Sequence, residues 1–198
     1  MSVNLTKDRG VGVITLDRPP ANSYDIGFTR EIGAAIDDAR VDEEIGAVVL
    51  RSASEKFFSA GADIGAFQKG SARQRWMTVL LMHEVLRKME TTPLIFIAEI
   101  AGHALGGGLE IALACDFRFA ANGDYKLGLP EVNLGLFPGN GGTQRLPRLV
   151  GKSKGLELIV KARTFSPEGA AKLGVVDRLF DDRADLRSKT LDYAAELA

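Results

Sequence analysis

Two glutamates beside glycine-rich segments are the residues of this chain best suited to chemistry. Glu110 ends the run Gly106-Gly107-Gly108-Leu109-Glu110, and Glu131 precedes a second glycine-rich loop at 139–142. Each glycine loses backbone entropy on folding, so three in succession indicate a place that another group must approach closely. If a helix begins there, its free N–H groups and positive dipole end are suited to hold a developing oxyanion. A carboxylate within one turn adds an acid or base.

A third segment, Phe58-Ser59-Ala60-Gly61-Ala62-Asp63, is also rich in small residues. Backbone N–H groups from this segment and from the triple glycine could converge on one carbonyl oxygen, with the two glutamates beside the reacting carbons. Such a site would polarise a thioester carbonyl and move protons at its α and β positions. Taken singly, Glu110 and Glu131 also suit the first turn of a helix, and Asp63 suits a helix cap. The combination favours catalysis for the two glutamates.

Bulk composition excludes several classes of function. The chain has 25 basic and 26 acidic residues and a net charge of −1, which gives no electrostatic footprint for nucleic acid or an anionic membrane. No apolar run approaches the roughly 20 residues of a membrane span. The single cysteine, Cys115, excludes an intrachain disulfide and predicts a reducing, cytoplasmic location. His83, His103 and Cys115 are widely separated and predict no metal site.

Strands and helices alternate, which predicts one α/β domain over residues 1–198. We expect strands at 3–7, 11–17, 47–50, 94–100, 117–121, 125–127 and 175–180, with hairpin turns at 8–10 and 122–123. Residues 57–63 are expected to form a turn. We expect helices at 25–42, 63–67, 72–90, from the triple glycine to about 115, from about 152, and at 186–198. In the third helix, the predicted buried stripe is Met77, Leu80, Leu81, Val85 and Met89.

Three long motifs occur in one order: FSAGADI at 58–64, GHALGGGLEIALACD at 102–116 and PEVNLGLFPGNGGTQRL at 130–146. In these motifs and their spacing the chain resembles the enoyl-CoA hydratase/isomerase family, also called the crotonase family. The resemblance implies an α/β fold of the crotonase type, a spiral of repeated β-β-α units over about 1–182. It also implies that 183–198 starts a C-terminal helical segment, which is truncated relative to the family.

The same resemblance implies roles for individual residues. The two oxyanion amides fall on Ala62 and Gly107, and the catalytic glutamates on Glu110 and Glu131. Many isomerases, hydrolases and decarboxylases of the family lack one glutamate, so the pair favours a hydratase. Glu110 would deprotonate a water, and Glu131 would exchange the proton at the α carbon. The implied substrate- and CoA-binding residues are Ala60, Ala62, Asp63, Ile64, Gly65, Gly106, Gly107 and Gly139.

The expected partner is an acyl-CoA substrate, with no metal and no cofactor beyond the CoA that the substrate carries. The family's homotrimer, or dimer of trimers, is the expected assembly. Two alternatives remain at this point: an enoyl-CoA isomerase in which Glu131 alone moves the proton, and a non-catalytic protein that binds CoA or a partner. The acyl group is not fixed by the sequence. Residues that could line an apolar pocket or belong to the core are Phe67, Trp76, Met77, Leu80, Leu136 and Phe137.

Overall fold

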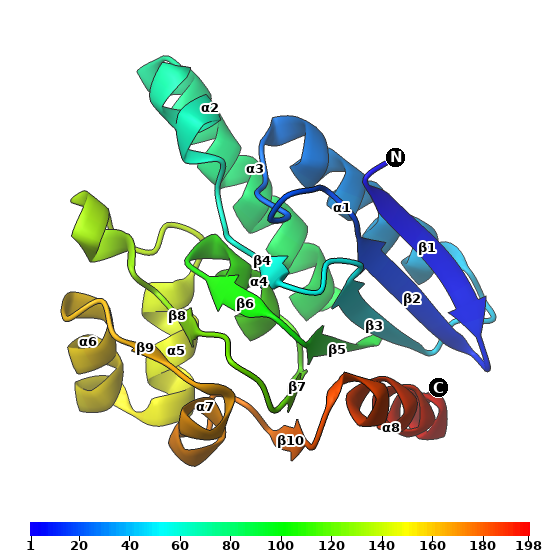
Figure 1. Ribbon diagram of the computed structural model, residues 1–198. Coiled ribbons are helices and arrows are strands. Elements are labelled where there is room, and N and C mark those ends of the chain that lie inside the picture. Colours follow the sequence, from blue (N-terminus) through cyan, green and yellow to red (C-terminus); the bar gives the residue numbers. More distant parts are fainter.

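Two β-sheets and the helices around them make up the fold in a computed structural model that describes residues 1–198 (Figure 1). The larger sheet has the order β1 (Val3–Asp8), β2 (Val11–Leu16), β3 (Ala47–Ser52), β5 (Ile95–Ile100), β7 (Phe117–Ala121), β10 (Arg178–Phe180). The smaller sheet has the order β4 (Phe57–Ser59), β6 (His103–Leu105), β8 (Leu127–Gly128), β9 (Thr164–Phe165). The helices are α1 (Ile26–Val41), α2 (Ile64–Lys69), α3 (Ala72–Thr91), α4 (Gly107–Leu113), α5 (Gly142–Val150), α6 (Lys152–Val160), α7 (Pro167–Leu173) and α8 (Arg183–Leu197), with a 3₁₀ turn, η1, at Glu131–Leu134.

The chain follows a spiral path between the two sheets. It passes three times from a strand of the larger sheet to a strand of the smaller sheet and then to a helix: β3-β4-α2, β5-β6-α4 and β7-β8-η1. Within each sheet these successive strands are parallel neighbours. The repeated β-β-α unit predicted from the family resemblance is therefore confirmed. Because the units stack in register, their strand-to-helix connections lie next to one another, and the three motifs occur at these connections.

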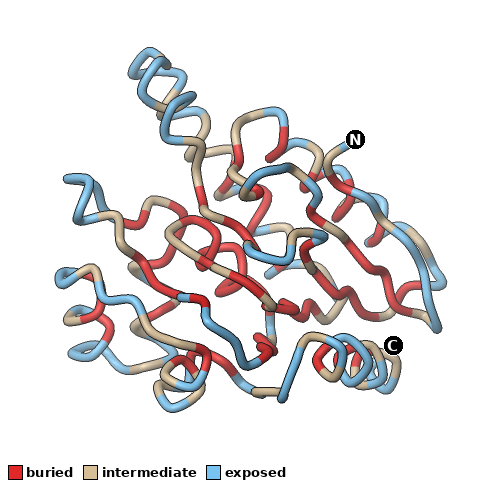
Figure 2. The backbone as a smooth tube through the Cα atoms, viewed as in Figure 1, coloured by how far each residue is buried: buried red, intermediate tan, exposed pale blue.

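Helices cover the larger sheet on both faces, which explains its apolar central strands. β3 is buried at Ala47, Val48, Val49 and Leu50, as expected for a parallel strand covered on two sides. One face packs with α1 and α3, and the other packs with α8 through Leu186 and Ala194 (Figures 1 and 2). This core fixes the sheet from which the site loops extend.

Local signals placed several element boundaries correctly. The first hairpin turns at Arg9 and Gly10, whose φ values of 51° and 78° are those of a tight hairpin turn. Asp25 caps α1 by accepting a hydrogen bond from the Phe28 N–H, at 2.9 Å. Asp63 caps α2 in the same way, through the Ala66 N–H at 3.0 Å. The predicted capping role of Asp63 is confirmed.

The predicted hairpin at 117–127 is wrong. β7 lies in the larger sheet, whereas β8 pairs with β6 in the smaller one. The Tyr125 hydroxyl lies 2.9 Å from the Ile100 carbonyl oxygen and 2.5 Å from that of Ala121, and these contacts hold the chain as it leaves the larger sheet. Asn122-Gly123 is thus a turn between sheets and not within one.

Other element predictions also need correction. Residues 57–59 form a strand where a turn was expected, and the strand expected at 175–180 begins only at Arg178. β6 and β9 were not predicted at all. In α3 the buried residues are Met82, Val85, Leu86 and Met89, while Met77 is 45% exposed. The first turns of α3 project beyond the sheets (Figures 1 and 2), and in its second half Val85 packs against Gly33 of α1 and Lys88 pairs with Asp37. No helix combines the length and apolar character that crossing a membrane requires.

Candidate active site

The triple glycine lies where β6 ends and α4 begins, and each position excludes a side chain for its own reason. Gly106 has φ 54°, and a Cβ there would lie 3.1 Å from Glu131 Oε1. A Cβ on Gly107 would overlap the Tyr24 hydroxyl, and one on Gly108 would overlap the Ser59 carbonyl oxygen. The sequence interpretation of a close approach is confirmed, and it applies to all three positions.

Two backbone N–H groups at this point have no intramolecular partner. Gly107 is the first residue of α4, so its N–H has no acceptor within the helix. The Ala62 N–H donates no hydrogen bond, whereas the adjacent N–H of Asp63 bonds to the Tyr24 carbonyl oxygen at 2.8 Å. A Cβ on Gly61, which has φ 88°, would lie 2.8 Å from the Gly107 nitrogen, so the two loops are in contact. The arrangement can bind an oxyanion.

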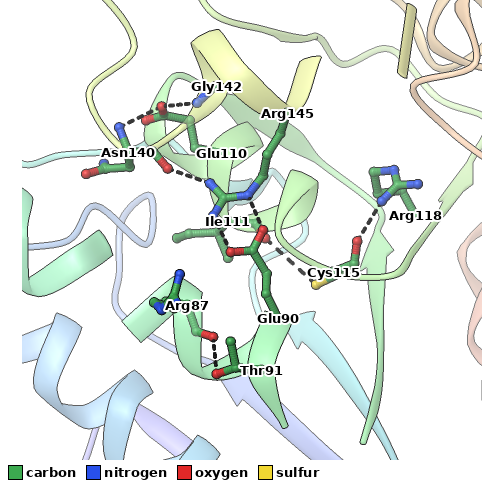
Figure 3. A network of polar contacts seen from close by, with 10 residues as sticks. All are labelled: Arg87, Glu90, Thr91, Glu110, Ile111, Cys115, Arg118, Asn140, Gly142 and Arg145. Carbon is green, nitrogen blue, oxygen red and sulfur yellow. Dashed lines mark hydrogen bonds and ion pairs between the residues drawn. The ribbon is translucent and has the colours of Figure 1, made fainter. Parts of the chain in front are cut away.

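Glu110 is held in a fixed position under the second glycine-rich loop. Its Oε1 accepts hydrogen bonds from the N–H groups of Asn140 and Gly142, each at 2.7 Å (Figure 3). The residue is 1% exposed. Burial raises the pKa of Glu110, and the hydrogen bonds from Gly142 and Asn140 partly oppose that rise. Oε2 accepts no hydrogen bond and is free to act on a bound molecule.

Glu131 occupies a different environment at the start of η1. It is half-buried, and its Oε2 is a buried atom with no hydrogen-bond partner. Burial raises the pKa of Glu131 to about 7, and the nearby charge of Glu110 adds to the rise. The structure therefore brings together two carboxylates 21 positions apart in sequence, since 131 − 110 = 21. Glu110 is held by two backbone hydrogen bonds and Glu131 has a pKa raised to about 7, so the pair suits a base and an acid.

The close contact at Gly108 predicts a large effect of a single methyl group. Gly108→Ala would place a Cβ against the Ser59 carbonyl group, whose carbon would be 2.7 Å away, so backbone must move. We expect a loss of about 1–3 kcal/mol in unfolding free energy, by overpacking. Thermal denaturation measures it. Gly27→Ala is the matched control, because its Cβ in the first turn of α1 meets only a side-chain oxygen, at 3.3 Å. Equal stability of the two variants would contradict the role of this contact.

Four residues that the sequence did not single out contact this site or support it. Tyr24 is 4% exposed, and its hydroxyl contacts the side-chain amide of Asn140. Arg145 donates from Nε and Nη2 to the two carboxylate oxygens of Glu90, both at 2.8 Å, and from Nη1 to the Asn140 carbonyl oxygen at 2.7 Å (Figure 3). The ion pair thus ties α3 to the loop that holds Glu110. A cavity of about 370 Å³ lies beside it between α3 and α5.

Loss of the Arg145 guanidinium group should loosen the loop before α5 that holds Glu110. Arg145→Met removes three hydrogen bonds, while its unbranched chain can fill part of the same space. We expect a roughly tenfold lower turnover, because Asn140 and Gly142 would no longer hold Glu110 in a single position. Arg148→Met is the control, since Arg148 lines the same cavity and makes no hydrogen bond to the loop. Steady-state kinetics of both variants check this, and equal turnover in the two would contradict it.

The residues predicted to bind CoA lie at the start of α2, at the start of α4 (Gly106 and Gly107) and in the loop before α5. Ala60, Asp63 and Gly139 are partly exposed, and Ile64 and Gly65 are exposed at the first turn of α2. Their CoA contacts stay predictions. Of the proposed pocket residues, Leu80 lines the cavity between α3 and α5, while Trp76, Met77, Leu136 and Phe137 are 64%, 45%, 47% and 72% exposed. No three His, Cys, Asp or Glu side chains cluster closely enough to hold a metal ion.

Comparison with known proteins gives a consistent result. The family model described as enoyl-CoA hydratase/isomerase matches residues 6–198. A probable enoyl-CoA hydratase of Bacillus subtilis (strain 168) is 40% identical, over 100% of this chain and 76% of its own length. A short-chain-enoyl-CoA hydratase of Clostridium acetobutylicum is 37% identical, over 100% of this chain and 74% of its own length.

Solved structures agree with the sequence relatives. An enoyl-CoA hydratase from Geobacillus kaustophilus HTA426 superposes with a TM-score of 0.96 and 43% identity, covering 99% of this chain and 74% of the other. One from Bacillus anthracis gives 0.95 and 34% identity, covering 100% and 76%. The chain is therefore shorter than these relatives by about a quarter, as the family resemblance predicted.

Proposed function

Because the chain belongs to the enoyl-CoA hydratase/isomerase family, we propose that it adds water reversibly to a 2-trans-enoyl-CoA to give the 3-hydroxyacyl-CoA. The observation that carries this proposal is the pair Glu110 and Glu131 beside the free N–H groups of Ala62 and Gly107. A site of this kind can stabilise a thioester enolate and handle two protons at once. The hydratase names of the relatives support the choice within the family.

The proposed mechanism divides the work among these four residues. The thioester oxygen lies against the N–H groups of Ala62 and Gly107, which stabilise the negative charge that develops on it. Glu110, in its ionised form, takes a proton from water as the water oxygen bonds to the β carbon. Glu131, in its protonated form, gives a proton to the α carbon as the carbon–carbon double bond becomes single. The reverse reaction expels water by the same transfers in the opposite direction.

Substrate assays test the proposal directly. Purified protein should remove the conjugated enoyl-thioester absorbance of crotonyl-CoA, and a panel of enoyl-CoA thioesters of different length, branching and aromaticity would identify the acyl group. A 3-enoyl-CoA converted to the 2-enoyl isomer without hydration would establish the isomerase alternative, for which Glu131 alone suffices. Calorimetric binding of CoA with no turnover on the whole panel would establish a non-catalytic binding protein and overturn the hydratase assignment.

The assembly and the compartment of the protein are part of the proposal. We expect a homotrimer or a dimer of trimers, supported by the large exposed apolar side chains of Trp76 and Phe137. Light scattering should give three or six times the 21.3 kDa chain mass, and a monomer would contradict the proposal.

The free, buried Cys115 supports a reducing compartment such as the cytoplasm. Fractionation of the source cells would test that location.

A further inference from the structure

Tyr24 places a buried phenol close enough to both glutamates for their charges to act on it. The residue follows β2, and its backbone is fixed by bonds to the loop that carries Ala62: its N–H donates to the Gly61 carbonyl oxygen at 2.9 Å, and its carbonyl oxygen accepts from the Asp63 N–H at 2.8 Å. Its hydroxyl reaches Gly107, where a Cβ would overlap it. Burial, with the charges of Glu110 and Glu131, raises the pKa of Tyr24 far above its usual range, so the phenol stays protonated.

The hydroxyl proton of Tyr24 has no acceptor in the structure. The oxygen accepts from the Asn140 side-chain amide, which directs the O–H away from that nitrogen. Asn140 Oδ1 is itself a buried atom without a hydrogen-bond partner, and the residue is 4% exposed. A buried donor and a buried acceptor therefore lie together, both unsatisfied. Buried polar groups are almost always hydrogen-bonded, so an unsatisfied pair indicates a bound group that the protein itself does not supply.

A hydrogen-bonding group is missing whichever way the Asn140 side-chain amide is turned. If its oxygen and nitrogen are exchanged, Tyr24 donates to Oδ1, and the two amide hydrogens become the buried unsatisfied groups. Either orientation leaves this pair one hydrogen-bonding molecule short. Glu131 Oε2 is a further buried oxygen without a hydrogen-bond partner. The Glu131 carboxylate is close enough for its charge to act on Tyr24. A water molecule, which makes two to four hydrogen bonds in such places, fits the pair Tyr24 and Asn140.

We propose that Tyr24 and Asn140 bind the water that is added to the substrate, with the Tyr24 hydroxyl donating to the water oxygen. The water donates one hydrogen bond to Glu110 Oε2 and the other to Asn140 Oδ1. One of its lone pairs accepts the hydrogen bond from the Tyr24 hydroxyl. Its second lone pair is then free to bond to the β carbon. In the reverse reaction Tyr24 donates to the hydroxyl oxygen that leaves. This inference rests on the proposed hydration.

Tyr24→Phe should slow the addition of water to the β carbon without slowing proton exchange at the α carbon. The variant removes one oxygen and keeps the ring that packs beneath α4. We expect hydration of crotonyl-CoA to fall roughly 10–100-fold in kcat with little change in KM, the range for loss of one hydrogen bond to a reacting group. Exchange of the α proton of butyryl-CoA with D₂O needs only Glu131 and the two N–H groups. We expect that exchange to stay within about threefold of wild type.

Two further variants complete the test. Asn140→Ala removes the other side-chain contact to the water but keeps the backbone N–H that holds Glu110, so it should show the same selective loss. Tyr125→Phe is the matched control, because Tyr125 is buried and its hydroxyl already contacts two carbonyl oxygens away from the glutamates. It should leave both reactions unchanged. Hydration by Tyr24→Phe within threefold of wild type, or an equal fall in hydration and exchange, overturns the proposal.

A crystal structure separates failure of this inference from failure of the proposed function. At high resolution, wild type should show a water within 3.2 Å of both Tyr24 Oη and a side-chain atom of Asn140, and Tyr24→Phe should lack it. A wild-type protein that shows the water but hydrates no thioester of the panel overturns the hydratase function and leaves the subsite standing. A wild-type protein that hydrates crotonyl-CoA but shows no water there overturns the subsite alone.

Discussion

Glu110→Gln is expected to reduce the hydration of crotonyl-CoA at least hundredfold while the protein stays folded. The glutamine side-chain oxygen can still accept the N–H groups of Asn140 and Gly142, which hold Glu110 Oε1 at 2.7 Å. The loop before α5 therefore keeps its anchor. An amide cannot take a proton from water, so only the general base is lost, and a positioned acid or base contributes about 10²–10⁴ in rate. Initial rates from the enoyl-thioester absorbance measure the change.

Glu99→Gln is the matched control for this variant. Glu99 is 3% exposed, and burial raises its pKa as it does that of Glu110. It lies on β5 at 3.6 Å from Arg187 and contacts none of the proposed site residues. Loss of a buried carboxylate is thus common to both variants, and only one is expected to lose activity. Wild-type rates in Glu110→Gln, or equal losses in both variants, would remove Glu110 from the mechanism.

The sequence predicted the long elements because their signals are local. Asp25 and Asp63 cap helices through their own side chains, and β2 and β3 carry continuous apolar runs. The strands of the smaller sheet are two or three residues long, too short for any periodicity to appear. They form because the spiral path brings these short segments into register, which is a property of the whole chain. The spiral itself was implied only by the family resemblance.

The candidate site shows the same division. The glycines and glutamates occur in motifs, and the structure brings them together as expected. Tyr24 and Arg145 make contacts with residues far away in the sequence. Tyr24 contacts Asn140, 116 positions away, and Arg145 pairs with Glu90, 55 positions away. A lone tyrosine in a loop carries no signal of that kind. The overlap of a Cβ on Gly107 with Tyr24, which explains why that glycine is required, is visible only in three dimensions.

Glu131→Gln is expected to lower hydration at least hundredfold and at the same time to raise stability at alkaline pH. Burial places the pKa of Glu131 at about 7, against 4.5 for an ordinary glutamate. Below pH 4.5 the carboxyl is protonated in both the folded and the unfolded protein, so the variant gains nothing there. As pH rises towards 7 the unfolded protein ionises first, and the wild type progressively loses stability. Above about pH 7 this cost is complete.

The gain should be about 1–2 kcal/mol at pH 8, after a discount for solvent screening of this half-buried group. It corresponds to roughly 2–8 °C in melting temperature for a chain of this size. Melting curves of wild type and variant at pH 4 and pH 8 measure the difference. An equal gain at both pH values would mean that better packing and not the missing charge is responsible. A variant that is less stable at pH 8 would contradict the burial of an ionised Glu131.

Glu131 should also set the alkaline limb of the pH profile of kcat/KM. Hydration begins with Glu110 ionised and Glu131 protonated, and the reverse reaction begins with the opposite arrangement. Both working forms carry one proton on the pair, so kcat/KM must have the same bell shape in the two directions. Its alkaline limb should fall above about pH 7, where the pair loses that last proton. A profile that stays flat to pH 9 would show that no proton on Glu131 is needed, and that the acid of the reaction is another group.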